Sequence, residues 1–243
     1  MTPVIIIPAR LGSTRFPRKM LANDTGMPLV MHACERARAT GYDRVVIATE
    51  DQEIADACPG VESVLTGSHP NGTSRLAEAA AKLGLAPDQV IVNVQGDEPE
   101  VEPDVIRAAV EALVDSDGAA AMGTVASPFQ PGENPDSPEL VKVVLAQDQS
   151  AIYFSRARIP FPRQEGPAPL KHIGIYVYTR AFLDHYVSLD PTPLEVTESL
   201  EQLRALERGF RIRVAIRNVT SGGIDTPEQY RAFVERERRR QES

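Results

Sequence analysis

The chain has little of what marks secreted or membrane proteins. It has only two cysteines, Cys34 and Cys58, in segments predicted to be helical, with no CxxC spacing and no His or Asp ligand set nearby. A disulfide framework is therefore not expected, and a reducing cytoplasm fits. No apolar run approaches the roughly 18 residues of a membrane-spanning helix. The first residues, "MTP", lead directly into a predicted strand, so we expect a soluble, untargeted, cytoplasmic protein.

The chain also lacks an excess of positive charge. It has 34 acidic residues against 26 lysines and arginines, which gives a formal net charge of −8. Proteins that bind nucleic acid or membrane surfaces generally present broad basic faces, so both classes are disfavoured. Any anionic ligand must therefore be bound by a local cluster of cations.

Short strand-like segments alternate with helical ones over most of the 243 residues. The apolar run "PVIIIPA" has no alternation, which is typical of a strand buried on both faces. Alternating strands and helices predict βαβ units, an α/β fold class and a mostly parallel central sheet flanked by helices. Strands are expected at 3–9, 44–49, 61–66, 89–95, 119–127, 172–179 and 210–216. Helices are expected at 28–40, 50–58, 73–84, 103–114, 179–187, 194–208 and after 226.

The pattern changes between about 128 and 172, where Pro, Gly and polar residues bracket two short apolar segments. We interpret this region as an excursion from the parallel core, either a small antiparallel layer or a contact between subunits. It is not expected to be separate, so the prediction is one domain over 1–243. The charged run "VERERRRQES" is expected to be a solvated helix end.

The loop after the first strand concentrates positive charge. Arg10, Arg15, Arg18 and Lys19 lie within "RLGSTRFPRK", with no carboxylate before Asp24. The loop has one glycine, so it is neither a dinucleotide fingerprint nor a GxxxxGK[ST] phosphate loop. Amides and hydroxyls at 12–14 followed by cations nevertheless suit a polyphosphate, although a solvated loop would have the same composition.

Two aspartates are candidate metal ligands. Asp97 follows the buried strand in "NVQGDEPEV", where a carboxylate is well placed to hold Mg²⁺, although a turn-capping role is the alternative. Glu98 and Glu100 are expected to be solvated. Asp225 precedes Thr226 and Pro227, which have the pattern of an N-cap and first helical residue, so it could be a capping acid. Together with the cationic loop, the two aspartates predict a nucleotidyl-transfer site.

Eight segments in order resemble the 3-deoxy-manno-octulosonate cytidylyltransferase (CMP-Kdo synthetase) family. They are "IIIPARLGSTRFPRK", "HPNGTSRLAE", "VNVQGDEPE", "VKVV", "IYFSRARIP", "KHIGIYVYTR", "PLEVTESLEQLRALERG" and "GIDTPE". The resemblance implies a Rossmann-like nucleotidyltransferase, usually a homodimer, that condenses CTP with 3-deoxy-manno-octulosonate (Kdo) to give CMP-Kdo and pyrophosphate with Mg²⁺. It also implies a place in lipopolysaccharide biosynthesis.

The same resemblance assigns site residues. Arg10, Arg15 and Lys19 would hold the triphosphate, and Asp97 and Asp225 would bind Mg²⁺. The remaining CTP contacts implied are Ala9, Ser13, Thr73, Arg75 and Gln95. The acceptor pocket implied consists of Arg156, His172, Glu201 and Gln202. From the residues alone, an arginine suits a carboxylate clamp. His172, however, could be structural, and the pattern leaves Glu201 and Gln202 in solvent.

The sequence departs from the family at several positions. Arg18 stands where a glycine is common, Met20 where a proline is common, and Ser68 where an Asp precedes the histidine. These changes, with a short excursion at 163–171, leave CTP binding details and the acceptor open. Alternative acceptors are an 8-amino-Kdo analogue, a sialic-type acid or a small phosphonic acid such as phosphonoformate. A nucleotide-binding module without catalysis is the alternative from another class, whereas the missing GxGxxG motif disfavours a dehydrogenase.

Overall fold

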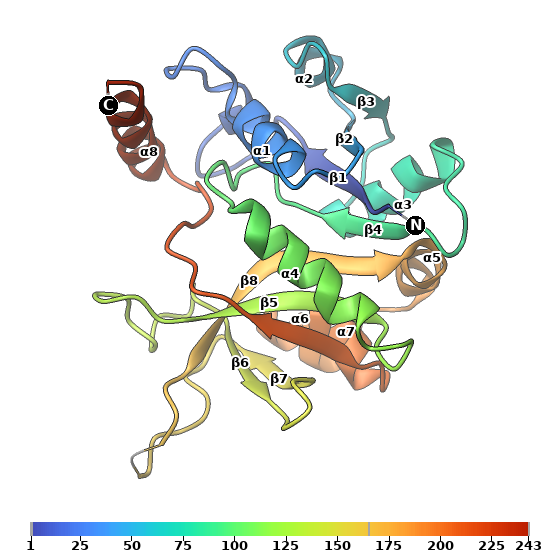
Figure 1. Ribbon diagram of the computed structural model, residues 1–243, viewed down its shortest axis with the longest axis vertical. Helices are drawn as coiled ribbons and strands as arrows, with labels where there is room; N and C mark the ends of the chain where they lie inside the picture. The colour runs from blue at the N-terminus through green and yellow to red at the C-terminus, as the bar shows by residue number, and fades with distance from the viewer. Residues whose placement is uncertain (1, 165, 243) are drawn as a thin grey trace. The chain divides into compact units, whose positions relative to one another are not determined.

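The computed structural model describes residues 2–164 and 166–242 and divides into two compact units (Figure 1). Unit 1 comprises Met1–Pro103 and Ser221–Ser243, and unit 2 comprises Asp104–Thr220. Position 165, within the predicted short excursion at 163–171, lies outside the described residues. The prediction of one domain over 1–243 stays a prediction.

Unit 1 contains a parallel sheet with strand order β3-β2-β1-β4. Its strands are β1 (Val4–Ala9), β2 (Arg44–Thr49), β3 (Glu62–Leu65) and β4 (Val90–Asn93). Its helices are η1 (Lys19–Leu21), α1 (Leu29–Arg38), α2 (Gln52–Asp56), α3 (Gly72–Lys82) and α8 (Pro227–Gln241). Every residue of β1 is buried, which confirms the prediction of a strand covered on both faces.

The order in which strands are added to this parallel sheet reverses at β1. The chain moves outward from β1 to β2 and β3, and then returns through α3 to place β4 on the other side of β1. With right-handed crossovers, α1 and α2 cover one face of the sheet and α3 covers the opposite face. Ligands of open α/β sheets bind outside the carboxyl ends of the strands at such a reversal, so the crevice beyond β1 and β4 is the expected site.

The C-terminal helix α8 packs on unit 1 through an apolar cluster. The cluster joins Leu29 of α1 to Ile224, Tyr230 and Phe233, and Phe16 of the cationic loop packs against it. The rings of Phe16 and Tyr230 lie 5.4 Å apart. Thr226 and Pro227 are the N-cap and first residue of α8, as predicted, with Gln229 completing a capping box.

A partly buried ion pair also joins α8 to the segment after β4. Glu100 is 8% exposed and accepts hydrogen bonds from Nη2 of Arg236 at 2.6 Å and from its Nε at 3.1 and 3.2 Å, and Arg240 lies 3.5 Å away. The prediction that Glu100 is solvated was therefore wrong. Nothing local to "VERERRRQES" indicates this contact, because Glu100 lies 136 positions from Arg236.

Unit 2 contains a mixed sheet in which β8 (Leu170–Thr179) pairs antiparallel with β5 (Met122–Pro128). On its other side β5 pairs parallel with β9 (Ile212–Ile216), and β6 (Lys142–Leu145) pairs antiparallel with β7 (Ala151–Ser155) and with β8. The predicted antiparallel layer within 128–172 is therefore present. The helices are α4 (Pro103–Val114), α5 (Arg180–Ser188), α6 (Pro193–Glu198) and α7 (Gln202–Glu207).

The predicted helix at 194–208 is two short helices. Ser199 ends α6 in the left-handed region, with φ of 52°. The carboxylate of Glu198 is occupied by partners in another segment, the Ser155 hydroxyl at 2.6 Å and the Arg156 amide at 2.9 Å. These non-local bonds hold the chain at a bend that local helix propensity does not predict.

Gly123 explains how closely α4 approaches β5. A Cβ at this position would lie closer than 3 Å to backbone atoms of α4, a distance that real side chains do not tolerate.

No helix within 2–164 and 166–242 is long and apolar enough to cross a membrane.

The loop that leads into α3 is held by one carboxylate. Glu78 accepts hydrogen bonds from the Gly67 amide at 3.0 Å and from Nε2 of His69, and Lys82 lies 2.7 Å away. The Lys82 ammonium and the His69 ring, followed by the amide, lower the pKa of Glu78 to about 2. Glu78 therefore fixes the loop that precedes the N-terminus of α3.

We expect Glu78→Gln to destabilise the protein at neutral pH. The folded pKa lies below the ordinary value of 4.5, so the stabilisation is present above pH 4.5 and is lost as the pH falls toward 2. The side chain is partly exposed, so the expected loss is about 1 kcal/mol at pH 7. Urea unfolding of both proteins at several pH values measures the difference. A difference that grows on acidification would contradict this assignment.

Candidate functional site

The cationic loop joins β1 to η1 and is tied to the start of α2. The Leu11 amide donates to Asp51 Oδ2 at 2.8 Å, and the Arg18 guanidinium pairs with Glu53. Arg18 has φ of 60°, in the left-handed region that favours glycine. The structure therefore gives this arginine a partner on α2, outside the cavity described next.

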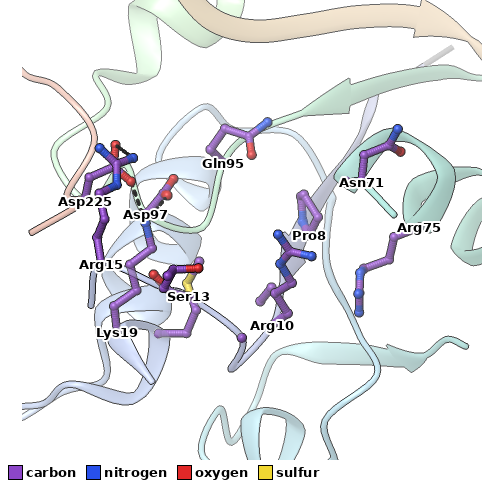
Figure 2. Close-up of a pocket in the computed structure, with 15 residues that line it drawn as sticks. Pro8, Arg10, Ser13, Arg15, Lys19, Asn71, Arg75, Gln95, Asp97 and Asp225 are labelled. Atoms are coloured by element: carbon purple, nitrogen blue, oxygen red, sulfur yellow. Dashed lines mark hydrogen bonds and ion pairs between the residues drawn. The ribbon is translucent and has the colours of Figure 1, made fainter. Parts of the chain in front are cut away.

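A cavity with a volume of about 360 Å³ lies at the carboxyl ends of β1 and β4, the expected place in the sheet. Figure 2 shows Asp225, Asp97, Arg15 and Lys19 on one side of it, and Asn71 and Arg75 on the other. The predicted nucleotide residues that line it are Ala9, Arg10, Ser13, Arg15, Lys19, Arg75 and Gln95. Thr73 follows the lining residue Gly72 in the first turn of α3 and is not one of the lining residues.

Lys19 joins the two predicted metal ligands. Its Nζ lies 2.6 Å from Asp97 Oδ2, 3.0 Å from Asp225 Oδ1 and 2.9 Å from the Ile224 carbonyl oxygen. Lys19 is only 6% exposed, and its three N–H donors match these three acceptors. Asp97 and Asp225, 128 positions apart in the sequence, therefore converge on one point.

The segment containing Asp225 is fixed on several sides. Arg15 pairs with Asp225 Oδ2 at 2.9 Å, so both carboxylate oxygens face a cation. The Ile224 amide donates to the Asp97 carbonyl oxygen at 2.8 Å. The Gln229 side chain accepts from the Asp225 amide at 2.7 Å, in addition to its bond within the capping box. The position of this carboxylate is thus set by the loop after β4 and by the start of α8.

Gly96 permits the loop after β4 to cross β1 closely. A Cβ here would lie 3.2 Å from both the Pro8 carbonyl oxygen and the sulfur of Met20. A side chain at 96 would therefore require a small shift of the Pro8 backbone, of Met20 or of the loop that carries Asp97. Met20, which replaces a common proline, is buried beneath this crossing.

The two aspartates fit a magnesium ion. Carboxylate oxygens are the ligands that Mg²⁺ prefers, and the ion commonly takes only one or two of them and completes its shell with water and phosphate oxygens. Among the described residues, no group of three or more His, Cys, Asp or Glu side chains is placed to hold a metal. A cation between Asp97 and Asp225 would thus depend on oxygens from a bound ligand or water.

Glu98 lies next to this pair. The prediction that it is a freely solvated acid was wrong. Burial, followed by the negative charge of Asp97, raises its pKa to about 7. At neutral pH a substantial fraction of Glu98 is protonated, which limits the negative charge beside Asp97.

Sequence reasoning missed the residues that support Arg75. Arg75 is 2% exposed and its Nη2 lies 2.9 Å from Glu50 Oε1, directly after β2. The Glu50 pKa is lowered, chiefly by this bond and also by Ser68, the residue that replaces a common Asp. Asn71 lines the cavity and caps α3 by accepting from the Ser74 amide. The signal that found Asp97, an acid after a buried parallel strand, could also have found Glu50.

The predicted acceptor residues all belong to unit 2. Arg156 donates to three carbonyl oxygens, those of Glu198 at 2.7 Å, Pro138 at 2.9 Å and Ser199 at 3.3 Å. It therefore holds the bend between α6 and α7. Two of its five N–H donors lie outside these bonds, and its role as a carboxylate clamp stays a prediction.

The structure differs from the sequence pattern at Gln202 and defines the environment of His172. Gln202 is 4% exposed, so the expectation from pattern alone that it is solvated was wrong. The carbonyl of Glu201 accepts from the Tyr186 hydroxyl at 2.7 Å at the start of α7. His172 contacts the Thr124 hydroxyl, and burial lowers its pKa to about 3. Its imidazole is therefore neutral at physiological pH.

Comparison with known proteins gives a consistent result. The sequence model of the family described as "Cytidylyltransferase" matches residues 4–212. A 3-deoxy-manno-octulosonate cytidylyltransferase of Anaeromyxobacter sp. (strain Fw109-5) is 49% identical over 229 residues, covering 92% of each chain. One of Syntrophobacter fumaroxidans is 48% identical over 241 residues, covering 96% of each chain.

Solved structures agree. CMP:2-keto-3-deoxy-manno-octonic acid synthetase complexed with CTP is similar with a TM-score of 0.90 and 37% identity, over 98% of this chain and 100% of that one. A putative glucose-1-phosphate thymidylyltransferase from Bacillus anthracis shares the fold, with a TM-score of 0.67 and 16% identity. The predicted α/β nucleotidyltransferase fold is confirmed. The chain is an enzyme of the nucleotidyltransferase class and belongs to the 3-deoxy-manno-octulosonate cytidylyltransferase family.

Proposed function

We propose that this protein transfers CMP from CTP to Kdo, releasing pyrophosphate, with Mg²⁺ as cofactor. The observation that carries the proposal is the convergence of Asp97 and Asp225 on Lys19 at the carboxyl ends of β1 and β4. The names of relatives that are 48–49% identical over almost the whole chain support CTP and Kdo as substrates.

The residues that line the cavity favour one orientation of a bound nucleoside triphosphate. The triphosphate would lie toward Arg10, Arg15 and Lys19, where guanidinium forks and an ammonium complement phosphate oxygens. The base and ribose would lie toward Arg75 and Gln95 on the other side of the cavity, with Thr73 close by. Glu50 holds Arg75 in place there.

Asp97 and Asp225 would hold Mg²⁺. When bound there, the ion would offset charge on the phosphates and help to orient the α-phosphate for attack. The Lys19 ammonium and the Arg15 guanidinium together balance the charge of the two carboxylates before CTP arrives, so the aspartates are held close together at little electrostatic cost. In the complex, Lys19 and Arg15 remain beside the carboxylates and face the phosphates.

The reaction would be a direct in-line displacement. The anomeric hydroxyl oxygen of Kdo bonds to the α-phosphorus, the bond from that phosphorus to the β-phosphate oxygen breaks, and pyrophosphate leaves with the electron pair. The hydroxyl proton passes to solvent, because the two cavity carboxylates already pair with Lys19. Catalysis then comes from positioning and charge neutralisation by Arg10, Arg15 and Lys19.

Arg156, His172, Glu201 and Gln202 are proposed to bind the acceptor. An 8-amino-Kdo analogue, a sialic-type acid and a small phosphonic acid are the competing acceptors for the same transfer. The proposal includes a homodimer with its contact within 128–172, and a cytoplasmic location, for which the small number of cysteines is the argument.

Asp97→Asn and Asp225→Asn are each expected to lower kcat by about 100-fold or more, because a ligand of the cation and a partner of Lys19 are lost together. Pyrophosphate release with CTP, Kdo and Mg²⁺ measures the effect. Asp104→Asn, which removes an exposed carboxylate on α4, is the matched control and should retain full activity. Near-normal turnover in either cavity variant would refute the metal assignment.

Lys19→Met should reduce kcat by about 10-fold or more while changing the KM for Kdo little, because the lost charge faces the phosphates. Steady-state kinetics with each substrate varied in turn distinguishes the two constants. Arg231→Ala, which removes an exposed cation from α8, serves as the control. A change confined to the KM for Kdo would place Lys19 on the acceptor side instead.

Substrate identity is tested with a panel. CTP, ATP, GTP and UTP are each combined with Kdo, 8-amino-Kdo, a sialic-type acid or phosphonoformate, and pyrophosphate is measured. We expect the highest kcat/KM for CTP with Kdo. A higher value with another acid would reassign the acceptor, and no pyrophosphate release in any combination would favour a nucleotide-binding module without catalysis.

A further inference from the structure

An irregularity in the sheet of unit 2 brings Thr124 and His172 together. Thr124 of β5 stands opposite Tyr176 of β8, but the next pair joins Val125 to Ile173. Two residues of β8 between these pairs are therefore unmatched, which makes a β-bulge. Bulges commonly redirect side chains beside functional sites.

The Thr124 hydroxyl donates a hydrogen bond to a backbone carbonyl within the bulge. Its Oγ1 lies 2.7 Å from the carbonyl oxygen of Ile175, one of the unmatched residues, and 3.3 Å from that of Ile173. Thr124 is fully buried, and its single hydroxyl hydrogen is directed to the nearer of these two oxygens, that of Ile175. The oxygen of Thr124 then has only acceptor capacity for its remaining neighbour.

That neighbour is the imidazole of His172. Its Nε2 lies 3.0 Å from Thr124 Oγ1. Because the hydroxyl hydrogen points to a carbonyl, Nε2 must carry the hydrogen of this bond. In a neutral imidazole only one nitrogen is protonated, so Nδ1 is an acceptor. Burial lowers the pKa of His172 to about 3, which is consistent with a neutral ring.

Nδ1 is available to a ligand. His172 is partly exposed, and among the described residues its Nδ1 has no hydrogen-bond partner. The imidazole ring packs against two aromatic rings. Its centroid lies 5.0 Å from that of Phe154, at an interplanar angle of 80°, and 5.2 Å from that of Tyr176, at 39°. The imidazole therefore presents one fixed acceptor atom on a rigid strand.

We infer that Thr124 is a positioning residue that fixes His172 as the neutral Nε2–H tautomer, so that Nδ1 accepts a hydrogen bond from a hydroxyl group of the acceptor acid. This inference rests on the proposed function and specifies what His172 recognises. A lone pair on Nδ1 repels a carboxylate and attracts a hydroxyl hydrogen. The acceptor is then a polyhydroxy acid, a class that excludes phosphonoformate.

The tautomer is tested directly by two-dimensional ¹H–¹⁵N NMR of the imidazole nitrogens in the full-length protein without substrates. The His172 signals are identified from their absence in His172→Asn. We expect a protonated Nε2 and an unprotonated Nδ1 at neutral pH. A protonated Nδ1, or a doubly protonated ring, would overturn the inference whether or not the enzyme acts on Kdo.

The functional consequence is tested with a matched pair of variants. Thr124→Val keeps the shape but loses the hydroxyl, and should raise the KM for Kdo by about fivefold or more, while the KM for CTP changes by less than about twofold. Thr124→Ser keeps the hydroxyl and should restore both the KM and the NMR pattern. An unchanged KM for Kdo in folded Thr124→Val would overturn the inference.

The proposed cytidylyl transfer and the tautomer of His172 are tested independently. If the wild-type protein releases no pyrophosphate with any acid, the proposed function fails, whereas the NMR result still decides the tautomer. If Thr124→Val does not fold, the wild-type spectrum and the Thr124→Ser kinetics remain decisive. In that case a Thr124→Ser enzyme with a wild-type tautomer but a raised KM for Kdo would count against the inference.

Discussion

The site depends on one buried ammonium group. Lys19 is 6% exposed and brings together two carboxylates from distant parts of the sequence, each within 3.0 Å of its Nζ. Two aspartates this close would repel each other strongly without it, since like charges at such distances interact by several kcal/mol in a partly buried site. The structure thus holds Asp97 and Asp225 in position with a cation of its own.

The C-terminal segment is essential to this arrangement. Asp225 reaches unit 1's cavity because α8 returns to pack on α1 and on Phe16 of the cationic loop. The Ile224 amide and the Glu100–Arg236 pair add polar ties to the segment after β4. The packing of α8 therefore helps to hold Asp225 beside the cationic loop.

Local pattern predicted most of the fold of unit 1 and the convergence of the cationic loop with two aspartates at its cavity. The apolar run of β1, the capping pair Thr226 and Pro227, and acids placed directly after strands have local physical signatures, and each is present as expected. The misses share a cause. The burial of Glu100 and the break at Ser199 depend on partners far away in the sequence, which spacing and composition do not encode. The family resemblance supplied the acceptor residues, which pattern alone did not indicate.

The central claim is that Asp97 and Asp225 hold one divalent cation together with the phosphates of CTP. The most direct measurement is anomalous X-ray scattering from crystals grown with CTP and Mn²⁺ as a substitute for Mg²⁺. The account predicts one strong peak about 2.2 Å from a carboxylate oxygen of each aspartate and in contact with phosphate oxygens. A peak that touches neither aspartate, with CTP bound, would contradict it.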